Sequence, residues 1–125
     1  MQENEISYKI RGAVFNVYNT LGPGLLESVY EAAVKHELQK NNITVESQVA
    51  VPVFYDNVKL DIGFRIDLLV NNSVVVEIKS VEVLAPVHHK QLLTYLKLTN
   101  KKLGLLVNFN TDNTSSGIIR IVNNL

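Results

Sequence analysis

The sequence predicts a single mixed α/β domain with a central sheet flanked by helices. At 125 residues the chain has room for one core, so residues 1–125 are expected to form one domain. The first forty residues carry apolar side chains at helical spacing, and the residues from Thr44 onward are rich in β-branched and aromatic types. A third helical stretch between strand-like segments gives the order ααβββαβ, which favours a sheet covered by helices.

Two helices are predicted before the first strand. The first has its apolar stripe at Ile6, Ile10, Ala13, Val14, Val17 and Leu21. It ends at "LGPG", because one proline and two glycines within four residues turn the chain. The second helix has its apolar stripe at Leu25, Leu26, Val29, Ala33, Val34 and Leu38, and it closes at Asn41 and Asn42.

The strand-like half of the chain is punctuated by short polar turns. Two long strands are expected on either side of the turn at Asp56 and Asn57, and the turn "NNS" leads into the strand "VVVEIKS". Pro86 suits the first turn of a third helix. These boundaries place the strands at 44–55, 58–70, 74–80 and 102–109, the third helix at 87–100, and a last strand or short helix at 117–124.

Composition narrows the classes of function. Twelve basic and twelve acidic residues cancel, which counts against an abundant non-specific nucleic-acid binder. Without cysteine there are no disulfides and no thiolate metal sites. The polar, acidic N-terminus is unlike a signal peptide, and no apolar run approaches the ~18 residues that span a bilayer. A cytoplasmic protein with no membrane partner is therefore expected.

Charged residues interrupt the two most strand-like segments. Because side chains alternate along a strand, Arg65 and Asp67 share one face, as do Glu77 and Lys79. If "NNS" is a three-residue hairpin loop, Val70 pairs with Val74. Asp67 then lies opposite Glu77 and Arg65 opposite Lys79, which are unfavourable like-charge pairs. A two-residue loop would break this parity.

These charges allow a chemical interpretation and a structural one. Two carboxylates on a partly buried sheet face form an oxygen pocket suited to Mg²⁺ or Mn²⁺, and the cation would remove their repulsion. Alternatively, the same charges form diagonal salt bridges, Arg65 with Glu77 and Asp67 with Lys79. The spacing alone does not separate the two.

Longer motifs resemble a known group of enzymes. Asp67, nine intervening residues and then "EIK" at 77–79 are similar to the D-xn-(D/E)-x-K signature of the PD-(D/E)XK nuclease superfamily. "GLLESVY" at 24–30 resembles the motif of the GxxExxY proteins, a family placed in that superfamily. The resemblance extends through "FRIDLLV", "PVHHKQLLTYL" and "LGLLVNF", and it implies a restriction-endonuclease-like core.

The resemblance also implies roles for individual residues. Asp67 and Glu77 would be metal ligands, joined by the carbonyl of Ile78, and Lys79 would position the attacking water. Glu27 matches an additional acid on a helix near the metal, and Gln91 matches a supporting position on the helix after the "EIK" strand. Ile66 stands where the superfamily name has proline, so the match rests on the acids and the lysine.

Each helical candidate also has an ordinary structural explanation. A carboxylate at Glu27 is favoured in the first turn of any helix, and Tyr30 is expected to be a half-buried packing residue. Gln91 and Tyr95 lie one turn apart and share a face. His88 and His89 point about 100° apart on a helix, so they cannot both bind one ion, although His88 could contact a phosphate.

Lysines gather in the later part of the chain despite the overall neutrality. Between Lys79 and Lys102 there are five lysines and one acid, Glu82. A phosphate track beside the pocket is one interpretation, and a solvated helix face is the other. The members of this group beyond the "EIK" strand are Lys90, Lys97, Lys101 and Lys102.

Two functions remain in competition at the level of sequence. The first is a Mg²⁺- or Mn²⁺-dependent nuclease that hydrolyses phosphodiester bonds of DNA or RNA. The second is a catalytically silent protein of the same fold that binds nucleic acid or protein. Retention of the full residue set favours the nuclease. A homodimer is also plausible, because so small a domain contacts little of a duplex.

Overall fold

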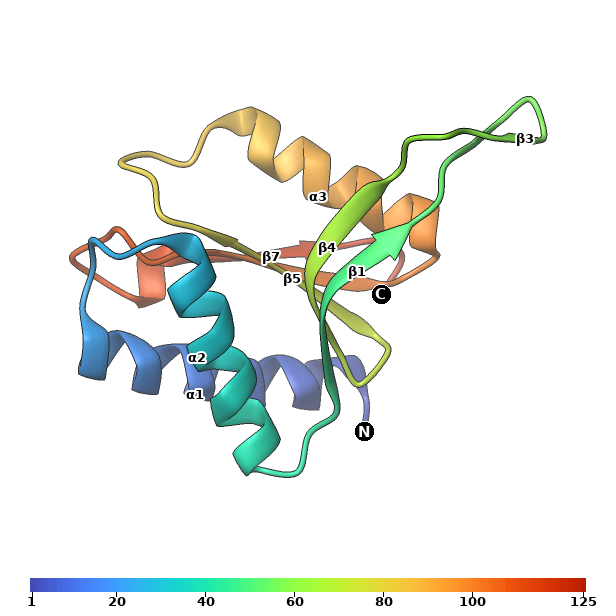
Figure 1. Cartoon of the computed structure of the whole chain (residues 1–125). Helices are drawn as coiled ribbons and strands as arrows, with labels where there is room; N and C mark the ends of the chain where they lie inside the picture. The colour runs from blue at the N-terminus through green and yellow to red at the C-terminus, as the bar shows by residue number, and fades with distance from the viewer.

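The computed structural model describes all 125 residues and confirms the expected mixed α/β fold. Three helices and a five-stranded sheet make up the body of the molecule (Figure 1). The elements in chain order are α1 (Glu3–Leu21), α2 (Glu27–Lys40), β1 (Val45–Val51), β2 (Phe54–Tyr55), β3 (Val58–Lys59), β4 (Phe64–Val70), β5 (Val74–Lys79), α3 (Pro86–Thr99), β6 (Leu103–Asn108), the 3₁₀ turn η1 (Ser115–Gly117) and β7 (Ile118–Val122).

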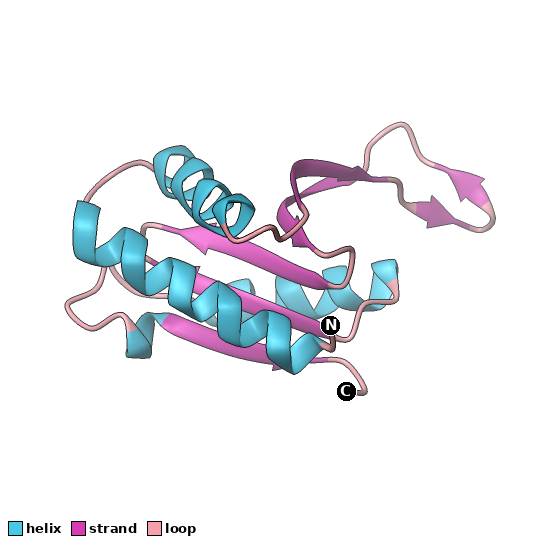
Figure 2. Ribbon diagram, turned by 90° about the horizontal axis from the view of Figure 1, so that it is seen from below, coloured by secondary structure: helices cyan, strands magenta, loops and turns pink.

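The central sheet is mixed, with strand order β1-β4-β5-β6-β7. Only β5 and β6 are parallel, and α3 supplies the crossover that a parallel pair requires. The other neighbours pair antiparallel. Helices α1 and α2 cover one face of the sheet and α3 covers the other (Figures 1 and 2).

Two apolar clusters hold these layers together. The larger cluster has 20 buried residues and joins α1 and α2 to side chains such as Val74, Val76 and Ile78 of β5. The smaller one lies under α3 and includes Val75 of the same strand. Strand β5 is buried on both faces, as expected for a strand inside a mixed sheet. No helix combines the length and the apolar character needed to cross a membrane.

The prediction of two long strands at 44–55 and 58–70 is wrong in one respect. Both strands are interrupted, and their outer ends form a separate two-stranded ribbon, β2 with β3. Pro52 has no N–H to continue the ladder of β1. At the other interruption a Cβ on Gly63 would collide with the carbonyl oxygen of Val51, so the chain leaves the sheet where only glycine fits.

Residues 52–63 therefore form an arm that projects from the body (Figures 1 and 2). The turn predicted at Asp56 and Asn57 forms its tip, and positive φ angles of 52° and 63° there match a tight hairpin turn. Large apolar side chains of the arm face solvent, with Tyr55 70% and Ile62 80% exposed. An uncovered apolar surface of this kind is a feature of binding proteins.

The last element, left open between strand and helix, is a strand. After η1 the chain enters β7, which pairs antiparallel with β6 along its length. This pairing covers one edge of β6 and leaves β1 and β7 as the edges of the sheet.

Candidate active site

The hairpin between β4 and β5 creates the site. Its loop has three residues, and Val70 pairs with Val74 as predicted. Regular pairing stops at Leu68 and Val76. The next two positions are Asp67 and Glu77, and at this point the strands are joined by side chains rather than by a backbone ladder.

The two carboxylates bridge the strands reciprocally. The backbone N–H of Asp67 donates to Oε2 of Glu77 at 2.8 Å, and the backbone N–H of Ile78 donates to Oδ2 of Asp67 at 2.8 Å. Each acid therefore satisfies an amide that the ladder leaves unpaired. One oxygen of each carboxylate is fixed in this way, and the second oxygen of Glu77 accepts no hydrogen bond from the chain.

The expected opposition of Arg65 and Lys79 is wrong, because the strands have already separated at that level. Ile66 and Leu69, three residues apart, pack in the same cluster under α3, so the in–out alternation of β4 shifts between them, around Asp67. Arg65 turns toward β1 instead and donates from Nη1 to the carbonyl oxygen of Gln48 at 3.1 Å.

The diagonal salt bridges are also absent. The structure contains one ion pair, Lys40 with Glu37 at 3.1 Å, and it is remote in sequence from the hairpin. Lys79, at the end of β5, is half-buried, and its side chain makes no hydrogen bond or ion pair. The structural interpretation of the charges in β4 and β5 is therefore wrong.

Burial makes the two carboxyl groups of the site costly to ionise. Glu77 is 6% exposed, and burial raises the pKa of its carboxyl from 4.5 to about 8, helped by the adjacent charge of Asp67. Burial likewise raises the pKa of Asp67. The ammonium group of Lys79 opposes both shifts without cancelling them. A positive charge between these acids would relieve the cost of ionising them.

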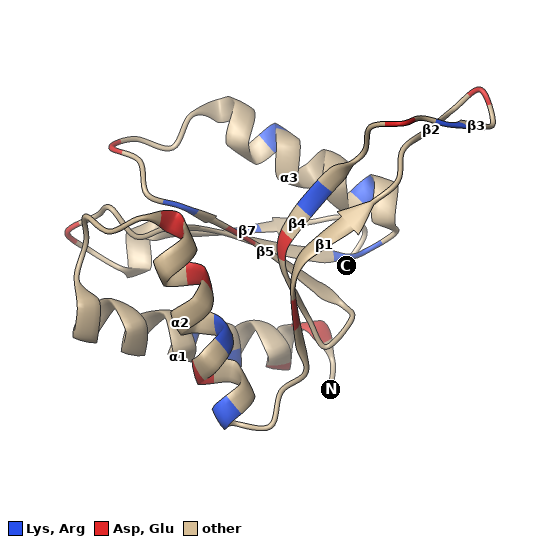
Figure 3. Cartoon of the chain, viewed as in Figure 1, with Lys and Arg blue, Asp and Glu red and all other residues tan.

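Glu27 lies beside this pair and is fixed to the end of β5. Its Oε2 accepts the backbone N–H of Ser80 at 3.0 Å, and the hydroxyl of Ser80 donates to the carbonyl oxygen of Leu25 at 2.9 Å. The carboxylate of Glu27 also contributes to the raised pKa of Asp67. Acidic positions are coloured on both α2 and β4 in Figure 3.

The rest of the "GLLESVY" motif holds the loop before α2. Tyr30 is fully buried, not half-buried as expected, and its ring stacks on Phe109 at 4.2 Å. The Tyr30 hydroxyl donates to the carbonyl oxygen of Gly22 at 2.5 Å and accepts the N–H of Leu25 at 3.0 Å. Gly24 has a φ of 98°, which favours glycine. The motif thus positions Glu27 through its loop.

Helix α3 brings Tyr95, rather than Gln91, into contact with the site environment. Tyr95 stacks on Phe64 at 4.1 Å. Burial raises the pKa of the Tyr95 hydroxyl, and the charges of Glu77 and Asp67 raise it further. Gln91 is exposed and makes no side-chain hydrogen bond. The two residues do lie one turn apart on α3, as predicted.

Two residues near the carboxylates were not singled out from the sequence. Gln48, on β1, donates from Nε2 to Glu31 at 2.7 Å and lies 3.4 Å from Oδ1 of Asp67. Burial raises the pKa of Glu31, and its charge in turn raises that of Glu77. Glu31 follows Glu27 by four residues, so helical spacing could have indicated it. No local pattern marks Gln48.

His88 and two of the clustered lysines have other places in the fold. Nδ1 of His88 accepts the backbone N–H of Ala85 at 3.1 Å and so caps the start of α3. Lys101 donates to the carbonyl oxygen of Asn72 at 2.9 Å, at the hairpin loop. Lys101 and Lys102 precede β6, whose first residue pairs with Val74. They lie at the opposite end of β5 from Lys79, so they form no phosphate track beside the pocket.

The donor set suits a divalent cation that keeps much of its water. No three or more acidic or histidine side chains converge closely enough to enclose an ion by themselves. Mg²⁺ commonly binds through one or two carboxylates with waters and substrate phosphates completing its shell. The buried pair Asp67 and Glu77 meets that requirement.

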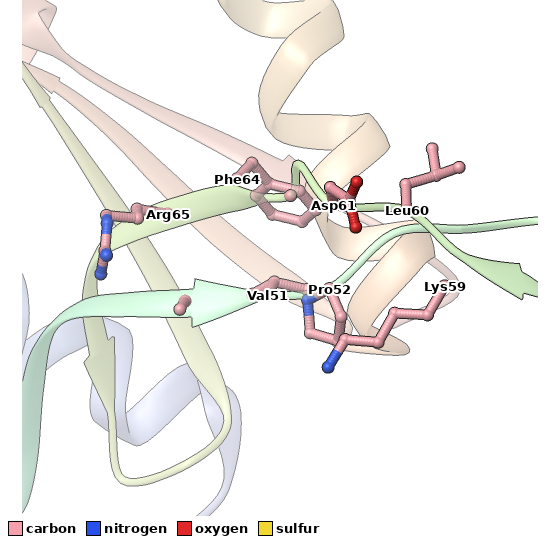
Figure 4. A pocket seen from close by; sticks show the side chains of 9 residues that line it. Val51, Pro52, Lys59, Leu60, Asp61, Phe64 and Arg65 are labelled. Atoms are coloured by element: carbon pink, nitrogen blue, oxygen red, sulfur yellow. The ribbon is translucent and has the colours of Figure 1, made fainter.

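One hollow of the surface is not lined by these carboxylates. It occupies about 540 Å³ at the base of the arm and is lined by residues such as Lys59, Phe64 and Arg65 (Figure 4). A second hollow of about 410 Å³ is lined by Leu25, Leu26, Glu27, Ser28 and Ser80. The second hollow therefore includes the carboxylate of Glu27 and the residue to which it bonds, Ser80.

Comparison with known proteins agrees with this geometry. A solved structure, the crystal structure of SSO0001, superimposes with a TM-score of 0.57 at 26% sequence identity, over 79% of this chain. The matched region is 51% of that chain, so the present chain spans about half the length of that protein. No curated protein matches the sequence.

A sequence model described as the PD-(D/E)XK nuclease superfamily matches residues 4–121, which is nearly the whole chain. The match includes both strands that carry the bridging carboxylates and the helices on either side of the sheet. The chain therefore belongs to the PD-(D/E)XK nuclease superfamily.

Proposed function

We propose that this protein is a nuclease that uses Mg²⁺ or Mn²⁺ to hydrolyse phosphodiester bonds of nucleic acid. One observation carries the proposal: the half-buried carboxylate of Asp67 and the buried carboxylate of Glu77 are held together at the point where β4 and β5 separate. Burial raises the pKa of both carboxyl groups, and the charge of Asp67 raises that of Glu77 further, which is costly for the fold and useful for binding a cation. Superfamily membership supports the same reaction class.

The proposed roles follow from the position of each group. Asp67, Glu77 and the carbonyl of Ile78 hold the cation, and Glu27 completes its surroundings from α2. When bound, the cation supplies Lewis-acid polarisation of the scissile phosphate and a more acidic water. Lys79 has no partner in the protein, so its ammonium group is free to orient that water and to stabilise charge on the phosphate. Gln91 is exposed on α3 and makes no side-chain hydrogen bond, so it would support the site only once the cation or the substrate is bound.

Three further assignments belong to this proposal. Gly24, Glu27 and Tyr30 support membership of the GxxExxY proteins within the superfamily. Residues 1–125 act as one nuclease-like domain. A homodimer would bring two such sites to one DNA or RNA substrate, which suits a domain of this size.

A cleavage assay with a triple variant tests the function. Wild-type protein is expected to cut labelled DNA or RNA, single- or double-stranded, when Mg²⁺ or Mn²⁺ is present and to stop when the metal is chelated. The variant Asp67→Ala, Glu77→Ala, Lys79→Ala is expected to lose cleavage. Cleavage by the triple variant at the wild-type rate would refute the assignment.

The competing function, a silent binding module, is favoured by one feature. The arm at residues 52–63 exposes Phe54, Tyr55 and Ile62 without a partner in the chain. Retention of substrate binding by wild-type protein without any metal-dependent cleavage would support that function over the nuclease.

A further inference from the structure

Strand β1 contains one residue in a strained backbone conformation, next to the site. Gln48 has a φ of 51° in the middle of the strand. The left-handed region is unfavourable for a residue with a Cβ, because the Cβ comes too close to the backbone. Strands β1 and β4 pair at Ser47 with Leu68 and at Val49 with Ile66. Gln48 and Asp67 lie between these two pairs and do not pair with each other.

In both β1 and β4, the alternation of side chains between the two faces of the sheet changes at this distortion. Val45 packs in the cluster under α1 and α2, and Ser47 accepts a hydrogen bond from Lys35 of α2 at 3.0 Å. Val49, two residues later, packs under α3, so the alternation of β1 changes at Gln48. Strand β4 changes its alternation around Asp67, the residue across from Gln48. The backbone of Gln48 and the placement of Asp67 are therefore coupled.

The side chain of Gln48 links two acids. Its Nε2 atom carries two hydrogens, of which one is donated to Oε1 of Glu31 at 2.7 Å and the other points to Oδ1 of Asp67 at 3.4 Å. Both neighbours are carboxylates, which fixes the amide with its nitrogen toward them. The carbonyl oxygen of Gln48, turned out of the ladder, accepts a hydrogen bond from Arg65.

We propose that Gln48 is a positioning residue for the metal-binding site, anchored on Glu31, which holds the free oxygen of Asp67 toward the cation. The inference rests on the proposed function, since it assigns Gln48 a role only if Asp67 is a ligand. Partners of metal ligands generally set ligand orientation, and their loss costs roughly 10–100-fold in metal affinity. The long and exposed contact of Gln48 with Asp67 places the expected effect near tenfold.

The variant Gln48→Gly removes the side-chain amide while it still allows the left-handed backbone, so it tests the side chain separately from the backbone conformation. Glycine adopts a φ of 51° without strain, so the fold is expected to keep its stability or gain some. Calorimetric titration of Mn²⁺ is expected to show binding about tenfold weaker than in wild type. Gln48→Glu, which replaces the donor with a third carboxylate, is expected to weaken stability and to retain the metal site. Gln39→Ala, an exposed glutamine on α2 with no side-chain hydrogen bond, serves as the control and is expected to change neither.

The outcomes separate this inference from the function it builds on. Wild-type affinity in Gln48→Gly would overturn the role of Gln48 and leave the metal site intact. An affinity loss accompanied by a matching loss of thermal stability would also overturn it, because a purely structural residue behaves that way. Absence of binding in wild-type protein would overturn both proposals. As a spectroscopic readout, the side-chain amide signal of Gln48 is expected to shift when Mg²⁺ is added to the wild-type protein.

Discussion

Replacing Lys79 with methionine is expected to lower the rate of cleavage about 100- to 1000-fold, the range seen when one group that stabilises transition-state charge is removed. Methionine keeps most of the length and apolar surface of the lysine stem and removes its charge. The side chain of Lys79 makes no hydrogen bond or ion pair, so this change deletes no polar contact of the fold. Steady-state cleavage with thermal denaturation of the same samples measures both effects.

The matched control is Lys59→Met on the arm. Lys59 is exposed and lies on β3, away from the carboxylates. The Lys59→Met variant is expected to keep the cleavage rate and the stability of wild type. A Lys79→Met protein that cuts within threefold of wild type, or one that fails to fold, would contradict the assigned role.

Replacing Glu77 with glutamine is expected to change how stability depends on pH. The pKa of Glu77 is about 8 in the folded protein and 4.5 as its reference value, so the folded state binds the extra proton between these values. The contribution of Glu77 to the free energy of unfolding of wild type should therefore be highest below pH 4.5. It should fall as the pH rises to 8. The shift from 4.5 to about 8 corresponds to a loss on the order of 4 kcal/mol.

Glutamine has no charge to bury and keeps an oxygen that can accept the backbone N–H of Asp67. Glu77→Gln should therefore match wild type near pH 4.5 and exceed it in stability at pH 8 and above. Urea unfolding at a series of pH values, without divalent metal, measures the difference. Glu46→Gln, at an exposed position on β1, is the control and should follow wild type. Parallel stability curves for Glu77→Gln and wild type would contradict the burial of an ionisable Glu77.

The central hairpin could be predicted because its features are local. A three-residue polar loop and the two-residue period of strands were enough to place Asp67 beside Glu77. The helical position of Glu27 followed in the same way from the apolar stripe of α2. The contact between Glu27 and the N–H of Ser80 spans 53 residues and was not predicted; only the resemblance to a family suggested that Glu27 lies near the metal site.

Other features depended on tertiary structure and left no local pattern. The left-handed backbone of Gln48 and the shift of β4 around Asp67 arise together across two strands, and neither residue type requires them. Simple alternation therefore placed Arg65 opposite Lys79, whereas Arg65 bonds to β1. The arm was missed because its residues have strand-like composition, and its separation from the sheet depends on Pro52 and on the crowding at Gly63.

Calorimetric titration of Mn²⁺ into wild type and into Glu77→Gln, at pH 8, tests the central claim most directly, because it needs no knowledge of the nucleic-acid substrate. One saturable site in wild type that is lost in Glu77→Gln is the predicted result. It would mean that the two acids between β4 and β5 form a metal site. No site in wild type, or a site of equal affinity in both proteins, would contradict the claim that these buried carboxylates bind the catalytic metal.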